Sequence, residues 1–124
     1  SEQLQVDIFG DRIFVYSPKG DIYNLPEGAL PLDFAYLVHS DIGKHAYAFN
    51  VNGKIHAFDK PLHEADVVEV ITRKSSRPKK DWLDLVKTTH GRAKVRSHLK
   101  KEGLLQPTSN ADAIRARKAK ENLK

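Results

Sequence analysis

With 124 residues and 40% apolar composition, the chain can form one small domain with an appendage. Its net charge is +5. The chain has no cysteine, which excludes disulfides and thiolate metal sites and fits a cytoplasmic location. It also has no methionine, so we expect that Ser1 lies inside a longer polypeptide. There is no apolar run of about eighteen residues and no signal-peptide pattern, so we expect neither export nor a membrane partner.

The first predicted element is an antiparallel hairpin. Residues 12–16 are rich in branched and aromatic side chains, which favour a strand. In residues 17–20, Pro18 and Gly20 stand where a type I turn prefers them. Residues 21–25 then return as the second strand, and residues 26–28 close the hairpin.

Residues 31–42 predict the one clear helix of the first half. Pro31 stands at the first helical position, Asp33 places an acid in the first turn, and Gly43 follows as a stop signal. Leu30, at the N-cap, offers no side-chain acceptor, so Pro31 rather than a cap marks the start.

The remainder of the first half predicts three more strands. Residues 45–51 alternate large and small side chains, Asn52-Gly53 is a strong hairpin signal, and residues 54–58 return. After a polar connection, residues 67–71 form a β-branched run typical of a central strand. Two hairpins around one helix, with a last strand between or beside the others, predict an α+β, β-grasp (ubiquitin-like) domain over residues 12–74, after a lead-in at 1–11.

Residues 75–124 differ from the domain in charge. Residues 1–74 hold 7 basic and 11 acidic side chains, a net charge of −4, whereas residues 75–124 hold 14 and 5, a net charge of +9. This asymmetry indicates that the tail meets a polyanion. The alternative is a solvated helical surface whose charges only keep it soluble.

The tail predicts short, mostly helical segments. Residues 79–88 place Trp82, Leu85 and Val86 at helical spacing, and we expect this apolar stripe to dock on the first domain. Residues 90–102 have few apolar side chains, so we expect that helix to be mostly solvated or partner-facing. From residue 106 the sequence is polar with Ile114 nearly alone as an anchor, which predicts partial disorder at the end.

Motifs of catalytic and cofactor sites are missing from the sequence. It has no phosphate-binding loop, no dinucleotide fingerprint and no zincin motif. Four histidines, at positions 39, 45, 56 and 63, are scattered without paired ligand spacing. We therefore expect no catalytic site in this chain, no cofactor and no metal.

Several stretches together carry a family resemblance. Four of them are similar to the TGS domain, namely residues 14–21, 31–36, 39–43 and 51–54. Three further stretches, residues 66–72, 81–83 and 87–89, extend the similarity to about residue 101. The chain thereby resembles the RelA/SpoT family of guanosine tetraphosphate synthetases and hydrolases. The Asp-Trp-Leu element at 81–83 and the basic run at 92–96 separate this family from threonyl-tRNA synthetases and TGS-bearing GTPases.

This resemblance implies a regulatory segment downstream of hydrolase and synthetase domains, with those catalytic domains of the same chain as partners. In ribosome-bound members of the family the TGS domain contacts the 3′ CCA end of deacylated tRNA. The histidine of the His-Ser-Asp stretch lies at that contact, and here it is His39, followed by Ser40. The implied partners are deacylated tRNA and the ribosome. Some members bind acyl carrier protein instead, which is the alternative, and a structural hinge is the third.

One departure from the family concerns the residues after this stretch. Many members have Gly-His-Arg-Cys where this chain has Gly43 followed by Lys44, His45 and Ala46, so we expect Lys44 and His45 to act only as electrostatic helpers. The family's helical region helps to hold the tRNA and ribosome. It implies phosphate contacts by five side chains: Arg92, Lys94, Arg96, Lys100 and Lys101.

The position of His39 on the predicted helix leaves two interpretations open. At about 100° per residue, Phe34, Ala35, Val38 and Ile42 cluster on one side as the buried stripe, and His39 lies just beyond its margin. It can therefore face a partner and stack on an unpaired base. The alternative is a histidine at the edge of the core, bonded to a neighbouring backbone carbonyl.

Overall fold

A computed structural model of the chain describes residues 10–105. Most of the predicted lead-in at 1–11, namely residues 1–9, and the predicted disorder from residue 106 lie outside these residues. The elements run in the order β1 (Arg12–Tyr16), β2 (Ile22–Pro26), α2 (Pro31–Val38), α3 (Ser40–Lys44), β3 (Ala46–Val51), β4 (Lys54–His56), β5 (Val68–Thr72), the 3₁₀ helix η1 (Lys80–Leu85) and α4 (Thr89–Lys101). The predicted α+β class is confirmed.

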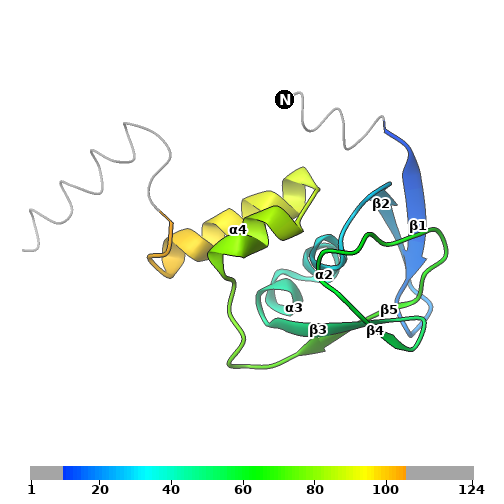
Figure 1. The fold of residues 1–124 in the computed structure, drawn as a ribbon, viewed down its shortest axis with the longest axis horizontal. Coiled ribbons are helices and arrows are strands. Elements are labelled where there is room, and N and C mark those ends of the chain that lie inside the picture. The colour runs from blue at the N-terminus through cyan, green and yellow to red at the C-terminus, as the bar shows by residue number, and fades with distance from the viewer. Residues whose placement is uncertain (1–9, 106–124) are drawn as a thin grey trace, which may run out of the picture.

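The strands form two small antiparallel sheets that meet at one point. β1 pairs with β2, and β3 lies between β4 and β5. A single parallel bridge joins Tyr16 to Val67, where the Tyr16 N–H donates to the Asp66 carbonyl at 2.8 Å. β5 therefore lies beside β1, and α2 lies over the sheets (Figure 1). Asn52 and Gly53 have φ of 54° and 83°, the left-handed geometry that a type I′ hairpin turn requires.

The predicted single helix over residues 31–42 is wrong, because the chain breaks it at His39. This residue is extended, with φ −169° and ψ 146°, between α2 and α3. Its N–H still donates to the Ala35 carbonyl at the end of α2, and its Nδ1 accepts the Asp41 N–H at 3.0 Å at the start of α3. His39 thus ends one helix and caps the next.

The core lies between the sheets and α2. Every residue of α2 from Pro31 to Tyr36 is buried, because strands cover one side of the helix and α4 contacts another. The strands contribute alternate side chains, among them Val15, Phe49 and Val68, which are fully buried. A helix covered on several sides also buries its polar residue, Asp33.

The tail packs on the domain through η1 and α4. Trp82 is 5% exposed and Val86 1%, and Leu85 packs half-buried against the core, so the predicted docking of this stripe is confirmed. Its first part is 3₁₀ rather than α-helical. The expectation that the next helix is mostly solvated is wrong for one of its faces, where Val95 and Leu99 have no exposed surface. Across the described residues, no helix is long and apolar enough to cross a bilayer.

Candidate nucleic-acid interface

A buried carboxylate fixes the start of α4 against α2. Asp33 Oδ1 accepts the backbone N–H groups of Lys87 and Thr88 and the Thr88 hydroxyl, each at 2.9 Å, while Oδ2 accepts the Leu30 N–H at 2.8 Å. Thr88 Oγ1 in turn accepts the Gly91 N–H at 2.9 Å and caps α4. Burial raises the pKa of Asp33, and these hydrogen bonds oppose the shift. The carboxylate therefore joins segments far apart in the chain.

A second contact joins α4 to both α2 and α3. Gly43 lies flat against the ring of Tyr36, where an added Cβ would sit 2.5 Å from ring carbons. The Tyr36 hydroxyl lies 3.3 Å from His98 Nδ1 on α4, and burial raises the pKa of Tyr36. Two separate contacts thus hold α4 in place, so α2, α3 and α4 present one surface (Figure 1).

This packing gathers positive charge around His98. Burial lowers the pKa of His98, and nearby lysines lower it further while Asp41 opposes them. The lysines come from two helices: Lys44 of α3, and Lys101 and Lys94 of α4. We call the three lysines around His98, namely Lys44, Lys94 and Lys101, the cationic cluster. It can attract an anion, and it spans the predicted domain and its tail.

His39 is connected to this cluster through Asp41, which it contacts and which also acts on His98, and its ring is exposed. Its side chain is 64% exposed, and its Nδ1 is 3.9 Å from an Asp41 carboxylate oxygen. Since Nδ1 accepts the Asp41 N–H, the neutral ring carries its proton on Nε2. The ring is therefore held at one end while its other nitrogen is a free donor.

The other residues predicted beside His39 have different surroundings. Ser40 and Lys44 are half-buried. His45 Nδ1 lies 3.0 Å from both the Ser76 carbonyl and Arg77 Nη1, and thus contacts the linker after β5. The structure brings His39 and Lys44 to one region, whereas His45 helps to hold the linker.

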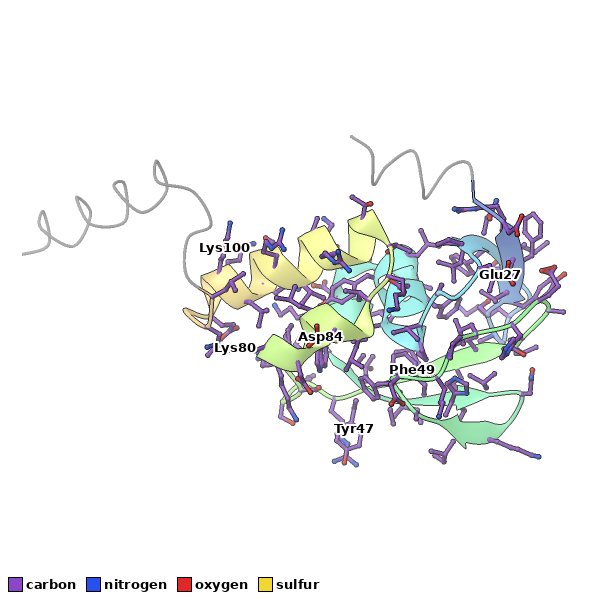
Figure 2. All side chains as sticks on the ribbon, turned by 45° about the horizontal axis from the view of Figure 1, so that its top comes forward. Glu27, Tyr47, Phe49, Lys80, Asp84 and Lys100 are labelled. Carbon is purple, nitrogen blue, oxygen red and sulfur yellow. The ribbon has the colours of Figure 1, made fainter. Side chains whose placement is uncertain are left out.

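The five predicted phosphate contacts do not share one face of α4. At about 100° per residue, Lys94 and Lys101 lie on the side of His98, while Arg92 and Arg96 lie beyond the opposite edge of the buried stripe. Arg96, Lys100 and Lys101 are exposed, and Arg92 and Lys94 are half-buried. Figure 2 shows Lys80 and Lys100 at the end formed by η1 and α4, far from Glu27 beside the first hairpin. Within residues 10–105, no group of three or more potential ligands could hold a metal ion.

Comparison with known proteins identifies the family of this domain. The model of the TGS domain matches residues 13–72. A GTP pyrophosphokinase of Myxococcus xanthus is 44% identical over 101 residues, and a guanosine-3′,5′-bis(diphosphate) 3′-pyrophosphohydrolase of Aquifex aeolicus is 40% identical over 101 residues. Each alignment covers 82% of this chain, but only 13% and 14% of the relatives.

The chain carries a TGS domain of the RelA/SpoT type. The predicted β-grasp fold is thereby confirmed for residues 13–72, with a C-terminal helix after it. A GTP pyrophosphokinase of Escherichia coli K12 is 38% identical over 105 residues, so the similarity continues beyond the TGS domain itself. The chain spans about one seventh of the length of these relatives.

Sequence reasoning missed three residues that build this surface around the TGS domain. Asp33 was used only as a helix-start signal, and Tyr36 and His98 were given no role. Their partners lie between 54 and 62 positions away in the chain. The spacing of residues within one element carries no signal for such contacts.

Proposed function

We propose that this chain is a regulatory segment that recognises the 3′ CCA end of deacylated tRNA on the ribosome and acts on the (p)ppGpp synthetase or hydrolase domains of a longer polypeptide. The observation that carries this proposal is the exposed, oriented ring of His39 beside the cationic cluster. The RelA/SpoT relatives, which are named for GTP pyrophosphokinase and guanosine-bis(diphosphate) hydrolase activities, support it.

The geometry of His39 suits an unpaired base. A base stacks on a flat ring whose face is open, and the free Nε2–H can donate to a base or ribose oxygen. Because the Asp41 N–H holds the other nitrogen, little ring freedom is lost when RNA binds. The single-stranded end of an RNA is therefore the ligand that the ring fits.

The cationic cluster suits the phosphates that lie on the 5′ side of such a terminal base. Lys44, Lys94 and Lys101 each lie close enough to His98 for their charge to lower its pKa, so a phosphate placed near His98 would be attracted by all three. Phosphate contacts position an RNA without reading its sequence. His39 would then provide recognition, and the cationic cluster would provide affinity and orientation.

The test is the binding of deacylated tRNA by His39 variants. His39→Glu introduces repulsion, whereas His39→Asn removes the ring but keeps an oxygen that can accept the Asp41 N–H. Both should weaken binding by roughly 1 to 3 kcal/mol, the range for one stacked base. Titrations should compare deacylated with aminoacylated tRNA, since the proposal requires a preference for the free end.

The matched control is His56→Asn, in β4 at the far side of the sheet, which should leave tRNA binding unchanged. The stability of each variant should be measured in parallel, because the cap of α3 depends on position 39. If His39→Asn folds normally and binds deacylated tRNA as tightly as the parent, His39 is not the recognition residue.

Acyl carrier protein is the second candidate, because the cationic cluster suits any acidic partner. Titration with acyl carrier protein separates the two. Binding that depends on the lysines but not on the His39 ring would favour the carrier protein. If neither partner binds, the segment is a hinge between other domains.

A further inference from the structure

β5 leaves one edge open beyond its bridge to β1. The Arg73 N–H donates to the His45 carbonyl at the end of β3, so residues 69, 71 and 73 turn their backbone groups toward β3. Val70 and Thr72 therefore turn theirs the other way, toward the side where β1 ends at Tyr16. Within residues 10–105 the backbone groups of Val70 and Thr72 on this side have no hydrogen-bond partner. An unpaired strand edge is a template for another strand.

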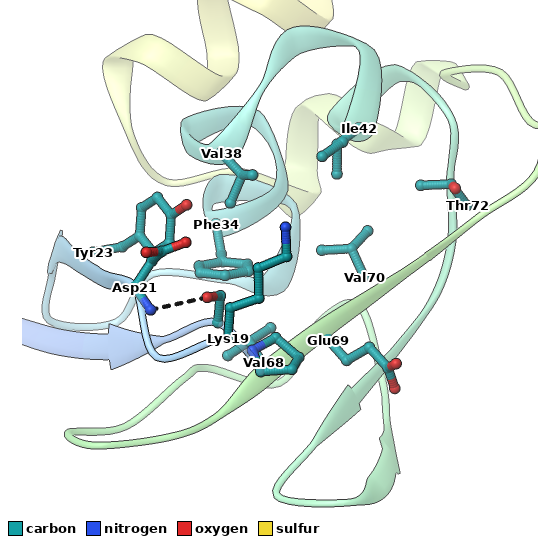
Figure 3. Close-up of a pocket in the computed structure, with 12 residues that line it drawn as sticks. Lys19, Asp21, Tyr23, Phe34, Val38, Ile42, Val68, Glu69, Val70 and Thr72 are labelled. Atoms are coloured by element: carbon teal, nitrogen blue, oxygen red, sulfur yellow. Dashed lines mark hydrogen bonds between the residues drawn. The ribbon is translucent and has the colours of Figure 1, made fainter.

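An apolar cavity opens beside this edge. Its volume is about 360 Å³, within the range of sites that hold a ligand side chain or small molecule. Figure 3 shows Phe34, Val38 and Ile42 from the helices facing Val68 and Val70 of β5 across it. A side chain on a strand paired with Val70 would point into this cavity, because neighbouring residues of paired strands share a face.

A smaller hollow of about 220 Å³ continues the cavity along β5, since Ile42 and Thr72 line both. Charged side chains stand at both ends of the groove. Lys19 and Asp21 line the first end with opposite charges, whereas the Glu69 carboxylate accepts a hydrogen bond from Asn50 on the other face of the sheet. Asp41 and Lys74 line the second end, also with opposite charges, whereas the Arg73 guanidinium lies over the Tyr47 ring at 3.7 Å.

We propose that this groove binds an extended peptide segment of a partner protein by adding it as a strand to the open edge of β5. The segment takes the place that β1 leaves after Tyr16 and so runs parallel to β5. It carries an apolar residue for the cavity, with a basic residue before it near Asp21 and an acidic residue after it near Lys74. The main chain supplies affinity, and the cavity supplies specificity.

A peptide fits these observations better than a nucleic acid. The unpaired backbone groups of Val70 and Thr72 match those of an extended peptide, and an apolar cavity offers a phosphate backbone no donors. The groove is also separate from the exposed ring of His39, which is not among its lining residues. The proposal therefore goes beyond the proposed function, and either can fail alone.

The test uses the chain of 124 residues and the probe peptide acetyl-Lys-Thr-Leu-Thr-Glu-amide, followed by amide and methyl chemical shifts. We expect saturable shifts at Val70, Thr72, Val38 and Ile42 at millimolar peptide or below. N-methylation of the threonine after leucine removes the N–H that would donate to the Val70 carbonyl. That change, like replacing leucine by aspartate, should abolish the shifts.

Thr72→Pro tests the edge from the protein side. It removes only the N–H that faces the groove, and proline is tolerated on open strand edges. It should weaken peptide binding about tenfold, while Thr72→Val should not. His39→Asn should leave peptide binding unchanged.

Three results would overturn the proposal: no saturable shift, equal binding of the N-methylated peptide, or displacement of the peptide by an RNA oligonucleotide that shifts the same amides. The last would make the groove a nucleic-acid site.

Discussion

Asp33 carries more of the tertiary structure than its place in the first turn of a helix suggests. It is 1% exposed, and its two oxygens accept hydrogen bonds from the start of its own helix and from residues 87 and 88. A buried carboxylate is costly unless each lone pair meets a donor. Here the donors belong mainly to the segment that leads into α4, so the cost of burial is offset only when α4 is docked.

Asp33→Asn tests this role, because it replaces one acceptor oxygen by an amide donor. Either the Leu30 N–H or the Lys87 and Thr88 groups then face a donor, which should destabilise the fold by about 1 to 3 kcal/mol. Chemical denaturation measures the difference. Asp84→Asn, at an exposed site on η1, is the control and should change stability by about 0.5 kcal/mol or less. Equal stability of the two variants would show that Asp33 does not hold α4.

Trp82 makes a second prediction at the scale of one residue. Its ring lies 6.1 Å from that of Phe58, which contacts Phe49 at 4.9 Å, so it connects η1 to the core under β3. Trp82→Ala should cost roughly 3 kcal/mol or more, since the cavity cannot collapse without moving both rings. The unfolding midpoint measures it. An unchanged midpoint would mean that η1 adds nothing to the stability of the domain.

At the scale of elements, local patterns predicted the strands better than the helices. Alternation and the Asn52-Gly53 turn place β3 and β4 within a few residues, because these signals are contained in the strands themselves. The break at His39 was missed, because it depends on α3 folding back so that Gly43 meets Tyr36. The buried face of α4 was also missed, because its burial depends on another element. Val95 and Leu99 are only two apolar side chains, but α2 covers them.

The candidate site was predictable only in part. The family resemblance pointed to His39, and in the structure the His39 ring is exposed and held in one orientation. Spacing alone put His39 on a continuous helix, where no side-chain cap would exist. The five basic residues of α4 were found by composition, but composition cannot show that Lys94 and Lys101 share their side with Lys44 while Arg96 does not.

The docking of α4 should make stability depend on pH. Burial and the neighbouring lysines hold the pKa of His98 below its usual 6.5, so the unfolded chain takes up this proton first as pH falls. The stabilisation of the fold that comes from unprotonated His98 is therefore complete above pH 6.5, and it is lost as the pH falls toward the lowered pKa of His98. Tyr36 of α2, Lys44 and Asp41 of α3, and Lys94 and Lys101 of α4 are the groups that face it.

Denaturation at about pH 7.5 and pH 5.5, on either side of the usual histidine pKa, measures this effect. His98→Gln should reduce the loss of stability on acidification, because glutamine has no proton to take up. His63→Gln, at an exposed site in the loop before β5, is the control and should retain the full loss. If His98→Gln is as sensitive to acid as the parent, the packing around His98 does not set the pH dependence.

For the whole molecule, the arrangement of charge decides what kind of partner it meets. Residues 1–74 have a net charge of −4 and residues 75–124 of +9, and α4 presents part of this excess beside α3. Because Asp33 and Tyr36 fix α4, the positive side is a surface of defined shape rather than a loose chain. A partner with regularly spaced negative charge can therefore contact both helices at once.

The last prediction is that RNA binding falls steeply with salt. Each phosphate contact releases condensed cations, with a slope of about 0.7 per contact for single strands, so the three lysines of the cationic cluster should lower affinity about twentyfold between about 50 and 200 mM salt. Lys94→Gln should reduce the slope by about 0.7, whereas Lys54→Gln, in β4 on the other side of the molecule, should not. Fluorescence anisotropy with a CCA-ended oligonucleotide at several salt concentrations measures both. Affinity that stays constant over this range would mean that the basic residues of α4 only solvate the helix, and a slope equally insensitive to both substitutions would place the RNA elsewhere.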